Sequence, residues 1–212
     1  LDSAYFCQVK DKTGKIIYRL PNHHFDIKAT SPGRGTIVLL GGVIDYGEIN
    51  RNLFWIRPNY VDTVYSTSDW TDVRPYYIIQ RNNRAADYAW SVRMKVGDIT
   101  REDAEREQLC NVYALKSGLL FNYLFNPKQQ GAGFCPANGK SKTISRLFKN
   151  DIDSYCPSID LWQAIAYKTL YQKEDYLYLL IDAFKFFEEG AKSPFPDLTE
   201  ESNPVLVKLK LK

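Results

Sequence analysis

The sequence predicts an α+β fold, in which an antiparallel sheet from the N-terminal half packs against helices from the C-terminal half. Two patterns predict it: apolar residues alternate with polar ones before Gly97, and they recur at helical spacing after it. The composition agrees, because 212 residues that are 44% hydrophobic can bury one sizeable core. We therefore expect a single domain over 1–212, mainly β over 1–97 and mainly α over 98–212.

The first half begins with a predicted hairpin. Residues 5–9 and 16–20 are strand-like and flank a turn in which Gly14 suits a positive φ angle. The clearest strand is expected at 88–96, because its large apolar residues fall on one face at a period of two. Further strands are expected at 25–29, 36–40, 61–65 and 76–81.

The second half begins with a helix signal. Thr100 and Asp103 have the spacing of a capping box, in which each side chain accepts a backbone N–H from the other, and this predicts a helix over 101–125. Proline at the start of one later segment and glycine at the end of another mark further helix boundaries. These helices are expected over 157–171 and 174–189, followed by a solvent-facing final strand over 205–211.

The cysteines bear on the cellular compartment: Cys7, Cys110, Cys135 and Cys156. Their even number, without a Cys-x-x-Cys pair, predicts two disulfides rather than a zinc site, and therefore an oxidising compartment. Among the three possible pairings we favour Cys7 with Cys110 and Cys135 with Cys156, because the second pair closes a local loop. The alternative is that the cysteines are free thiols packed as small hydrophobic side chains.

The chain begins at Leu1 rather than at methionine, which agrees with removal of a targeting segment. No Asn-x-Ser/Thr sequon occurs, so a bacterial envelope fits better than a eukaryotic secretory route. We expect a periplasmic or extracellular protein, held at a membrane only if a lipid-bearing cysteine preceded Leu1. The formal charge is +3 with acidic residues interspersed among the basic ones, which argues against nucleic acid as a partner.

One segment resembles a phosphate-binding loop. Residues 133–141 read Gly-Phe-Cys-Pro-Ala-Asn-Gly-Lys-Ser, a pattern in which backbone N–H groups would cradle phosphates. The spacer is one residue too long, no strand is expected before it, and Pro136 removes a backbone donor. We therefore expect no nucleotide or other cofactor, and the spacing of potential ligands identifies no metal site.

A histidine and two carboxylate pairs are the remaining candidates for catalysis. On a strand, His24 would share a face with Asp26 and would be a general base if a nucleophile lay nearby. Carboxylate pairs suited to acid–base chemistry lie among turn-forming residues: Asp69 with Asp72, and Asp151 with Asp153. Such carboxylates ordinarily cap turns, so we assign no catalytic residue.

A stretch rich in tyrosine, tryptophan and arginine is the best candidate for partner binding. These residue types carry much of the binding energy at protein interfaces, because they bury large areas and keep polar groups available. The alternatives are that the aromatic rings form the core of the sheet, or that Trp70 stacks on a sugar. The candidate contact residues are Arg57, Tyr65, Trp70, Arg74, Tyr76 and Tyr77.

The leading hypothesis from the sequence is an exported, non-enzymatic protein that binds and neutralises another protein, such as a toxic enzyme. This is the role of an immunity-type inhibitor. The second hypothesis is a secreted or periplasmic hydrolase that uses His24 or a carboxylate pair. The third is a glycan-binding module.

Overall fold

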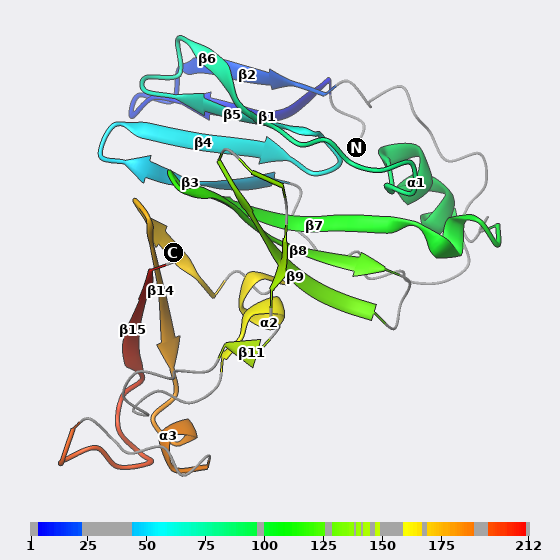
Figure 1. Ribbon diagram of the computed structural model, residues 1–212. Coiled ribbons are helices and arrows are strands. Elements are labelled where there is room, and N and C mark those ends of the chain that lie inside the picture. The colour runs from blue at the N-terminus through cyan, green and yellow to red at the C-terminus, as the bar shows by residue number, and fades with distance from the viewer. Residues whose placement is uncertain are drawn as a thin grey trace.

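The computed structural model describes residues 4–22, 44–96, 100–125, 129–137, 139–140, 142–144, 147–148, 159–166, 169–188 and 195–210. Within these ranges the chain is mainly β, and every strand pairing is antiparallel (Figure 1). The α-helices in this part are short: α1 (Tyr88–Val96), α2 (Leu161–Ala166) and α3 (Lys185–Glu188). The predicted α+β fold, with a sheet packed against C-terminal helices, is therefore wrong.

The first half of the chain forms two sheets. The expected hairpin is present, and the Asp11 carboxylate accepts the backbone N–H groups of Thr13 and Lys15 in its turn. The hairpin strands are β1 (Tyr5–Lys10) and β2 (Ile16–Pro21). The second sheet has the order β3-β4-β5-β6, with β3 (Ile44–Asn50), β4 (Leu53–Pro58), β5 (Thr63–Thr67) and β6 (Val73–Ile78).

The second half of the chain, expected to be mainly α, forms three further sheets. The central sheet has the order β10-β9-β8-β7, with β7 (Glu107–Ala114), β8 (Gly118–Phe125), β9 (Gln129–Pro136) and β10 (Lys142–Ile144). A short pair consists of β11 (Leu147–Phe148) and β12 (Ile159–Asp160). The last sheet has the order β13-β14-β15, with β13 (Tyr171–Lys173), β14 (Tyr176–Ile181) and β15 (Val205–Lys210).

The central sheet is buried on both faces. Leu119 and Leu120 are neighbours in β8, so their side chains point to opposite faces. Leu119 joins a core formed with the β3–β6 sheet, which includes Trp55 and Val64. Leu120 joins a larger core formed with α2 and the β13–β15 sheet. The strands therefore stack in layers, with the central sheet in the middle (Figure 1).

Residues 101–125, expected to form one helix, instead contain a single 3₁₀ turn followed by β7 and β8. The capping interaction itself is present, since Asp103 N–H donates to Thr100 Oγ1 at 3.1 Å. It caps one turn only, because the chain is already extended at Arg106. Both faces of the following strands are largely buried, so apolar residues do not alternate and the spacing resembles that of a helix.

Residues 88–96, expected to form a strand, are helix α1. The deciding residue is Asp87, whose carboxylate accepts the N–H of Trp90 at 2.6 Å and so caps the first turn. The reverse error occurs at 174–189, where β14 and the one-turn helix α3 replace the expected helix. The final alternating stretch is β15, at the place where a strand was expected.

Gln172 in β13 connects three sheets. Its side-chain oxygen accepts Trp55 Nε1–H at 3.1 Å, and its nitrogen donates to the carbonyl oxygens of Glu48 and Ala114. Gly47 makes room for this arrangement, because a Cβ atom there would lie 2.6 Å from Trp55 Nε1. The β13–β15 sheet is thus fixed to β3, β4 and β7 by one buried amide.

Candidate functional site

The cysteines in the described residues are free thiols. Cys7 lies in β1, Cys110 in β7 and Cys135 in β9, and none of them forms a disulfide. Cys156 lies outside the described residues. The expected pairing of Cys7 with Cys110 is therefore wrong, and Cys135 is also a free thiol. Burial raises the pKa of Cys110 to about 12, so its thiol stays protonated near neutral pH.

Arg57, proposed above as a contact residue, is fully buried and belongs to a polar cluster between β3, β4 and β7. Its Nη1 donates to Asp45 Oδ2 at 3.1 Å, and its Nε donates to the Val61 carbonyl oxygen at 3.0 Å. Asp45 also accepts the side-chain amide of Asn111 and the N–H of Val112. Burial lowers the pKa of Arg57, and the charge of Asp45 opposes that shift. Arg57 is therefore unavailable to a partner.

Tyr76 and Tyr77 in β6 are partly buried and pack against the core between the central sheet and the β3–β6 sheet. Their rings make an edge contact with centroids 4.6 Å apart. The Tyr77 hydroxyl donates to the Leu115 carbonyl oxygen at 3.0 Å, and burial raises its pKa. These two tyrosines thus contribute mainly to internal packing.

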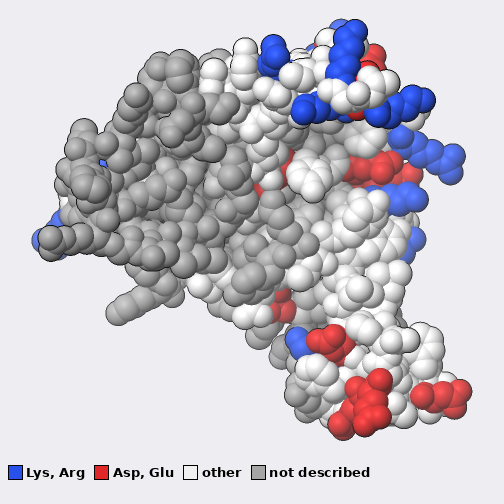
Figure 2. Space-filling view, turned by 180° about the vertical axis from the view of Figure 1, so that it is seen from behind, with Lys and Arg blue, Asp and Glu red and all other residues white. Residues whose placement is uncertain are grey.

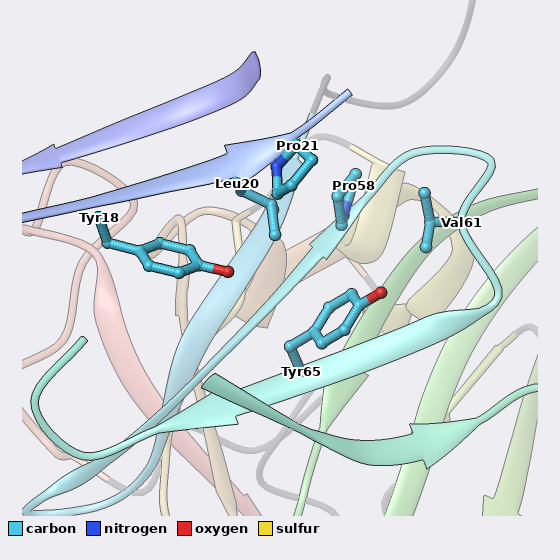
Figure 3. Close-up of a pocket in the computed structure, with 6 residues that line it drawn as sticks. All are labelled: Tyr18, Leu20, Pro21, Pro58, Val61 and Tyr65. Carbon is cyan, nitrogen blue, oxygen red and sulfur yellow. The ribbon is translucent and has the colours of Figure 1, made fainter. Parts of the chain in front are cut away.

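Tyr65 lines a cavity of about 220 Å³ between the hairpin and the β3–β6 sheet. Figure 3 shows its ring entering from β5, while Tyr18 enters from β2. The rest of the lining consists of Leu20, Pro21, Pro58 and Val61. Among the described residues of this lining, the polar side-chain groups are the tyrosine hydroxyls, so the cavity suits a small apolar group better than acid–base chemistry.

Trp70 and Arg74 lie near the turn between β5 and β6. The Trp70 ring packs against Tyr18 with centroids 6.2 Å apart, and Trp70 N–H donates to Thr67 Oγ1. Arg74 pairs with Asp72, and the two side chains are 76% and 55% exposed. The predicted contact residues therefore divide into a buried group and a group at one end of the β3–β6 sheet.

Of the candidate catalytic residues, the structure describes only the Asp69–Asp72 pair. His24 and Asp26, and the Asp151–Asp153 pair, lie outside the described residues. Asp69 accepts the N–H and hydroxyl of Thr71, which lowers its pKa as expected for a turn residue. Residues 133–136, the start of the phosphate-loop resemblance, are the end of strand β9.

A surface that the sequence analysis missed lies on the outer face of the β13–β15 sheet. We call it the tyrosine–lysine face, and its residues are Tyr171, Lys173, Tyr176, Tyr178, Leu180, Leu206, Lys208 and Lys210. These residues alternate with the buried Gln172, Leu177, Leu179, Ile181 and Leu209. Period-two alternation over three strands thus gives one apolar face and one exposed face.

The strand register arranges the tyrosine–lysine face in rows. Tyr176 pairs with Lys210, Tyr178 with Lys208, and Leu180 with Leu206. One end of the face is therefore aromatic and basic, and the other is aliphatic. Leu180, Leu206 and Tyr171 are 64%, 63% and 61% exposed, and they border an open hollow of about 510 Å³.

Cation–π contacts of Lys208 and Lys210 with Tyr176, and of Lys208 with Tyr178, hold the basic end together. Lys208 Nζ lies 3.7 Å from the centroid of the Tyr176 ring, and Lys210 Nζ lies 5.7 Å from it. Glu174 in the adjacent turn is exposed, whereas Asp175 accepts the N–H of Ser117. Figure 2 shows mainly acidic side chains at the lower end of the molecule, and basic side chains with some acidic ones between them in the upper part.

The sequence held part of the signal for this face. Tyr176 to Leu179 alternate tyrosine with leucine, and the final stretch alternates lysine with valine or leucine. The first stretch was assigned to a helix, and the second was recognised only as a solvent-facing strand. Their pairing depends on a connection of more than twenty residues, which the sequence pattern does not specify.

In the part of the chain that the structure describes, no three His, Cys, Asp or Glu side chains cluster as metal ligands would. None of the helices described is long and apolar enough to cross a membrane. No protein-family model matches the chain, and neither a curated protein nor a solved structure does so.

Proposed function

We propose that this protein functions by binding another protein, and that the tyrosine–lysine face is the contact surface. The observation that carries the proposal is a sheet face that presents three tyrosines, three lysines and two leucines to solvent. Tyrosine buries a large area at low entropic cost and keeps a hydroxyl for hydrogen bonding. Exposed apolar side chains surrounded by polar ones are typical of interaction sites.

The rigidity of this face supports the proposal. Leu177, Leu179 and Leu209 hold its strands on the apolar core, and Gln172 fixes β13 to the other sheets. A surface fixed before binding loses little conformational freedom when the partner arrives. The tyrosines are therefore prearranged for contact.

A protein fits this face better than a single-stranded nucleic acid. Bases would need free aromatic faces on which to stack, whereas the Lys208 ammonium group lies directly over the Tyr176 ring. A nucleic acid would also leave Leu180 and Leu206 without an apolar partner. A protein surface with acidic and apolar residues would satisfy both ends of the face.

Neutralisation of a toxic enzyme, favoured by the sequence, is the specific form of this function that we carry forward. It predicts that the bound partner loses its activity. The surface around Tyr65, Trp70 and Arg74 remains a second candidate contact region for the same function, since Arg74 is strongly exposed.

The test begins with capture of partners from the source organism on immobilised protein, followed by mass spectrometry and measurement of Kd for the purified partner. We expect Tyr171→Ala and Leu180→Ala each to weaken binding at least tenfold, or about 1.4 kcal/mol. Their melting temperatures should be nearly unchanged, because both side chains are mostly exposed.

The matched controls are Lys12→Ala in the exposed hairpin turn, which should leave Kd unchanged, and Trp70→Ala at the second candidate region. If Trp70→Ala loses affinity and Tyr171→Ala does not, the contact surface is the second candidate region and not the tyrosine–lysine face. Capture of a nucleic acid that is lost on nuclease treatment, with no protein bound, would overturn the proposal.

A further inference from the structure

Among the strands that the structure describes, β15 has a partner on one side only. It pairs with β14 along six residue pairs, from Val205–Ile181 to Lys210–Tyr176, and no described strand pairs with its other side. Figure 1 shows β15 as the outermost strand of that sheet. An edge strand presents backbone N–H and C=O groups that can pair with a further strand.

Two other edge strands of the fold are less suited to strand addition than β15. β6 is an edge strand of the β3–β6 sheet, but it contains Pro75, which has no N–H to donate. β13 is an edge strand of only three residues. β15 has six residues and no proline, so its length and backbone suit strand addition.

The side chains of β15 define what an added strand must carry. Val205, Val207 and Leu209 face the core, and the first two are only partly buried, so they can accept further apolar side chains. The opposite face presents Leu206, Lys208 and Lys210. Since side chains opposite each other in neighbouring strands interact, an added strand needs aliphatic residues on one face and acidic residues on the other.

A second copy of this chain does not meet that requirement. Antiparallel pairing of β15 with itself, with the two outer faces on the same side and Leu206 opposite Lys210, would place Lys208 opposite its own counterpart. Like charges directly opposite each other destabilise a sheet. The lysines therefore disfavour self-pairing in this register, and β15 itself carries no acidic residue to offer to a second copy, whereas an acidic strand would pair with them.

We propose that β15 accepts, by strand addition, an extended segment of the partner protein in which aliphatic residues alternate with aspartate or glutamate. This inference rests on the protein-binding function proposed above and identifies the part of the partner that binds. The added strand extends the apolar core past Val205 and Val207, and its carboxylates pair with Lys208 and Lys210.

The experiment measures binding of synthetic peptides of about eight residues, long enough to cover β15. One peptide alternates valine with glutamate, and a second alternates valine with lysine. We expect the acidic peptide to bind at least about tenfold more tightly than the basic one. Equal binding of the two peptides would overturn the proposal.

Backbone pairing is tested by N-methylation of the acidic peptide. Methylation of every valine nitrogen and methylation of every glutamate nitrogen block opposite edges of the peptide strand. One of these modified peptides should lose binding, and the other should retain it. If both bind as well as the unmodified peptide, strand addition is wrong, although partner binding at the tyrosine–lysine face survives.

The electrostatic part is tested by the double variant Lys208→Glu, Lys210→Glu. It should lose affinity for the acidic peptide and gain affinity for the basic one, a reversal that misfolding would not produce. The double variant Lys12→Glu, Lys15→Glu at the exposed hairpin turn is the control of equal charge change, and it should alter neither affinity. A Lys208→Glu, Lys210→Glu variant that still prefers the acidic peptide would contradict the proposed pairing.

Discussion

The central sheet contacts the β3–β6 sheet partly through a charged, hydrogen-bonded cluster at its edge strand β7, whereas its contacts with the β13–β15 sheet are mainly apolar. In the cluster, Asp45 pairs with Arg57 and accepts the side-chain amide of Asn111 and the backbone N–H of Val112. The buried residues of the apolar core are leucines, isoleucines, alanines and two aromatic residues, with partly buried valines packed against them. Polar pairing requires each group at one position, whereas apolar packing tolerates small shifts. We therefore expect the polar cluster to be sensitive to the loss of one partner, and the apolar core to be sensitive to the loss of buried volume.

We expect the largest loss of unfolding free energy from Asp45→Ala. This change leaves the fully buried Arg57 without its carboxylate partner, and loss of one member of a buried ion pair costs roughly 3–5 kcal/mol of unfolding free energy. Urea denaturation measures it. Asp45→Asn, which keeps the size of the side chain and one acceptor oxygen, should cost less and provides a folded variant for comparison.

The control is Asp72→Ala, which removes the carboxylate from an exposed pair with Arg74. Its unfolding free energy should be essentially unchanged, because water screens that pair. Equal costs for Asp45→Ala and Asp72→Ala would show that the buried cluster has no special part in holding the two sheets together.

We expect the second-largest loss of unfolding free energy from a change in the apolar core between the central sheet and the β13–β15 sheet. Leu177→Ala removes a fully buried side chain from the core beneath β14 and should cost about 3 kcal/mol. Leu180→Ala, three residues further along the same strand but 64% exposed, should leave the midpoint of thermal unfolding nearly unchanged. If both variants are destabilised alike, the assignment of buried and exposed faces in β14 is incorrect.

The smallest effect concerns an ion pair at the boundary between core and solvent. Hydrogen bonding to Arg93 lowers the pKa of Asp103 to about 2, from an ordinary value of 3.8. A carboxyl group with a lowered pKa in the folded state stabilises the protein above the unfolded-state value and loses that effect as pH falls. Asp103→Asn should therefore cost roughly 1–2 kcal/mol at neutral pH, since Arg93 is partly exposed.

The measurement for Asp103→Asn is the unfolding free energy of variant and parent across pH. The difference between them should shrink as pH falls from about 4 toward 2. A difference that stays constant over that range would mean that the carboxylate charge is not the source of the stabilisation.

Local signals in the sequence were sufficient for some elements. The first hairpin forms because its turn is encoded within five residues, with Asp11 capping backbone N–H groups and Gly14 at φ 87°. The capping interaction between Thr100 and Asp103 agrees with the prediction from the sequence. The helical segment that follows it is much shorter than predicted. A capping pattern marks where a helical turn begins and carries no information on where the chain leaves it.

The wrong predictions of strands and helices occur mostly where contacts between distant segments decide the structure. β7 and β8 are buried on both faces, and this removes the alternation by which a strand is recognised. Asp87 was overlooked as a cap, so helix α1 was assigned to a strand. The tyrosine–lysine face requires β15 to pair beside β14, a choice made by the shared apolar core and not by either stretch alone.

Gln172 has a consequence for the order in which this chain folds. Its partners Ala114, Trp55 and Glu48 are 58, 117 and 124 positions away along the chain. Such contacts carry the full entropic cost of closing long loops, and they form only when distant segments have already met. The amide therefore joins its partners late in folding, and the C-terminal strands should dock in a step that depends on the earlier sheets. A ribosome must have released the chain through β15 before that step can be completed.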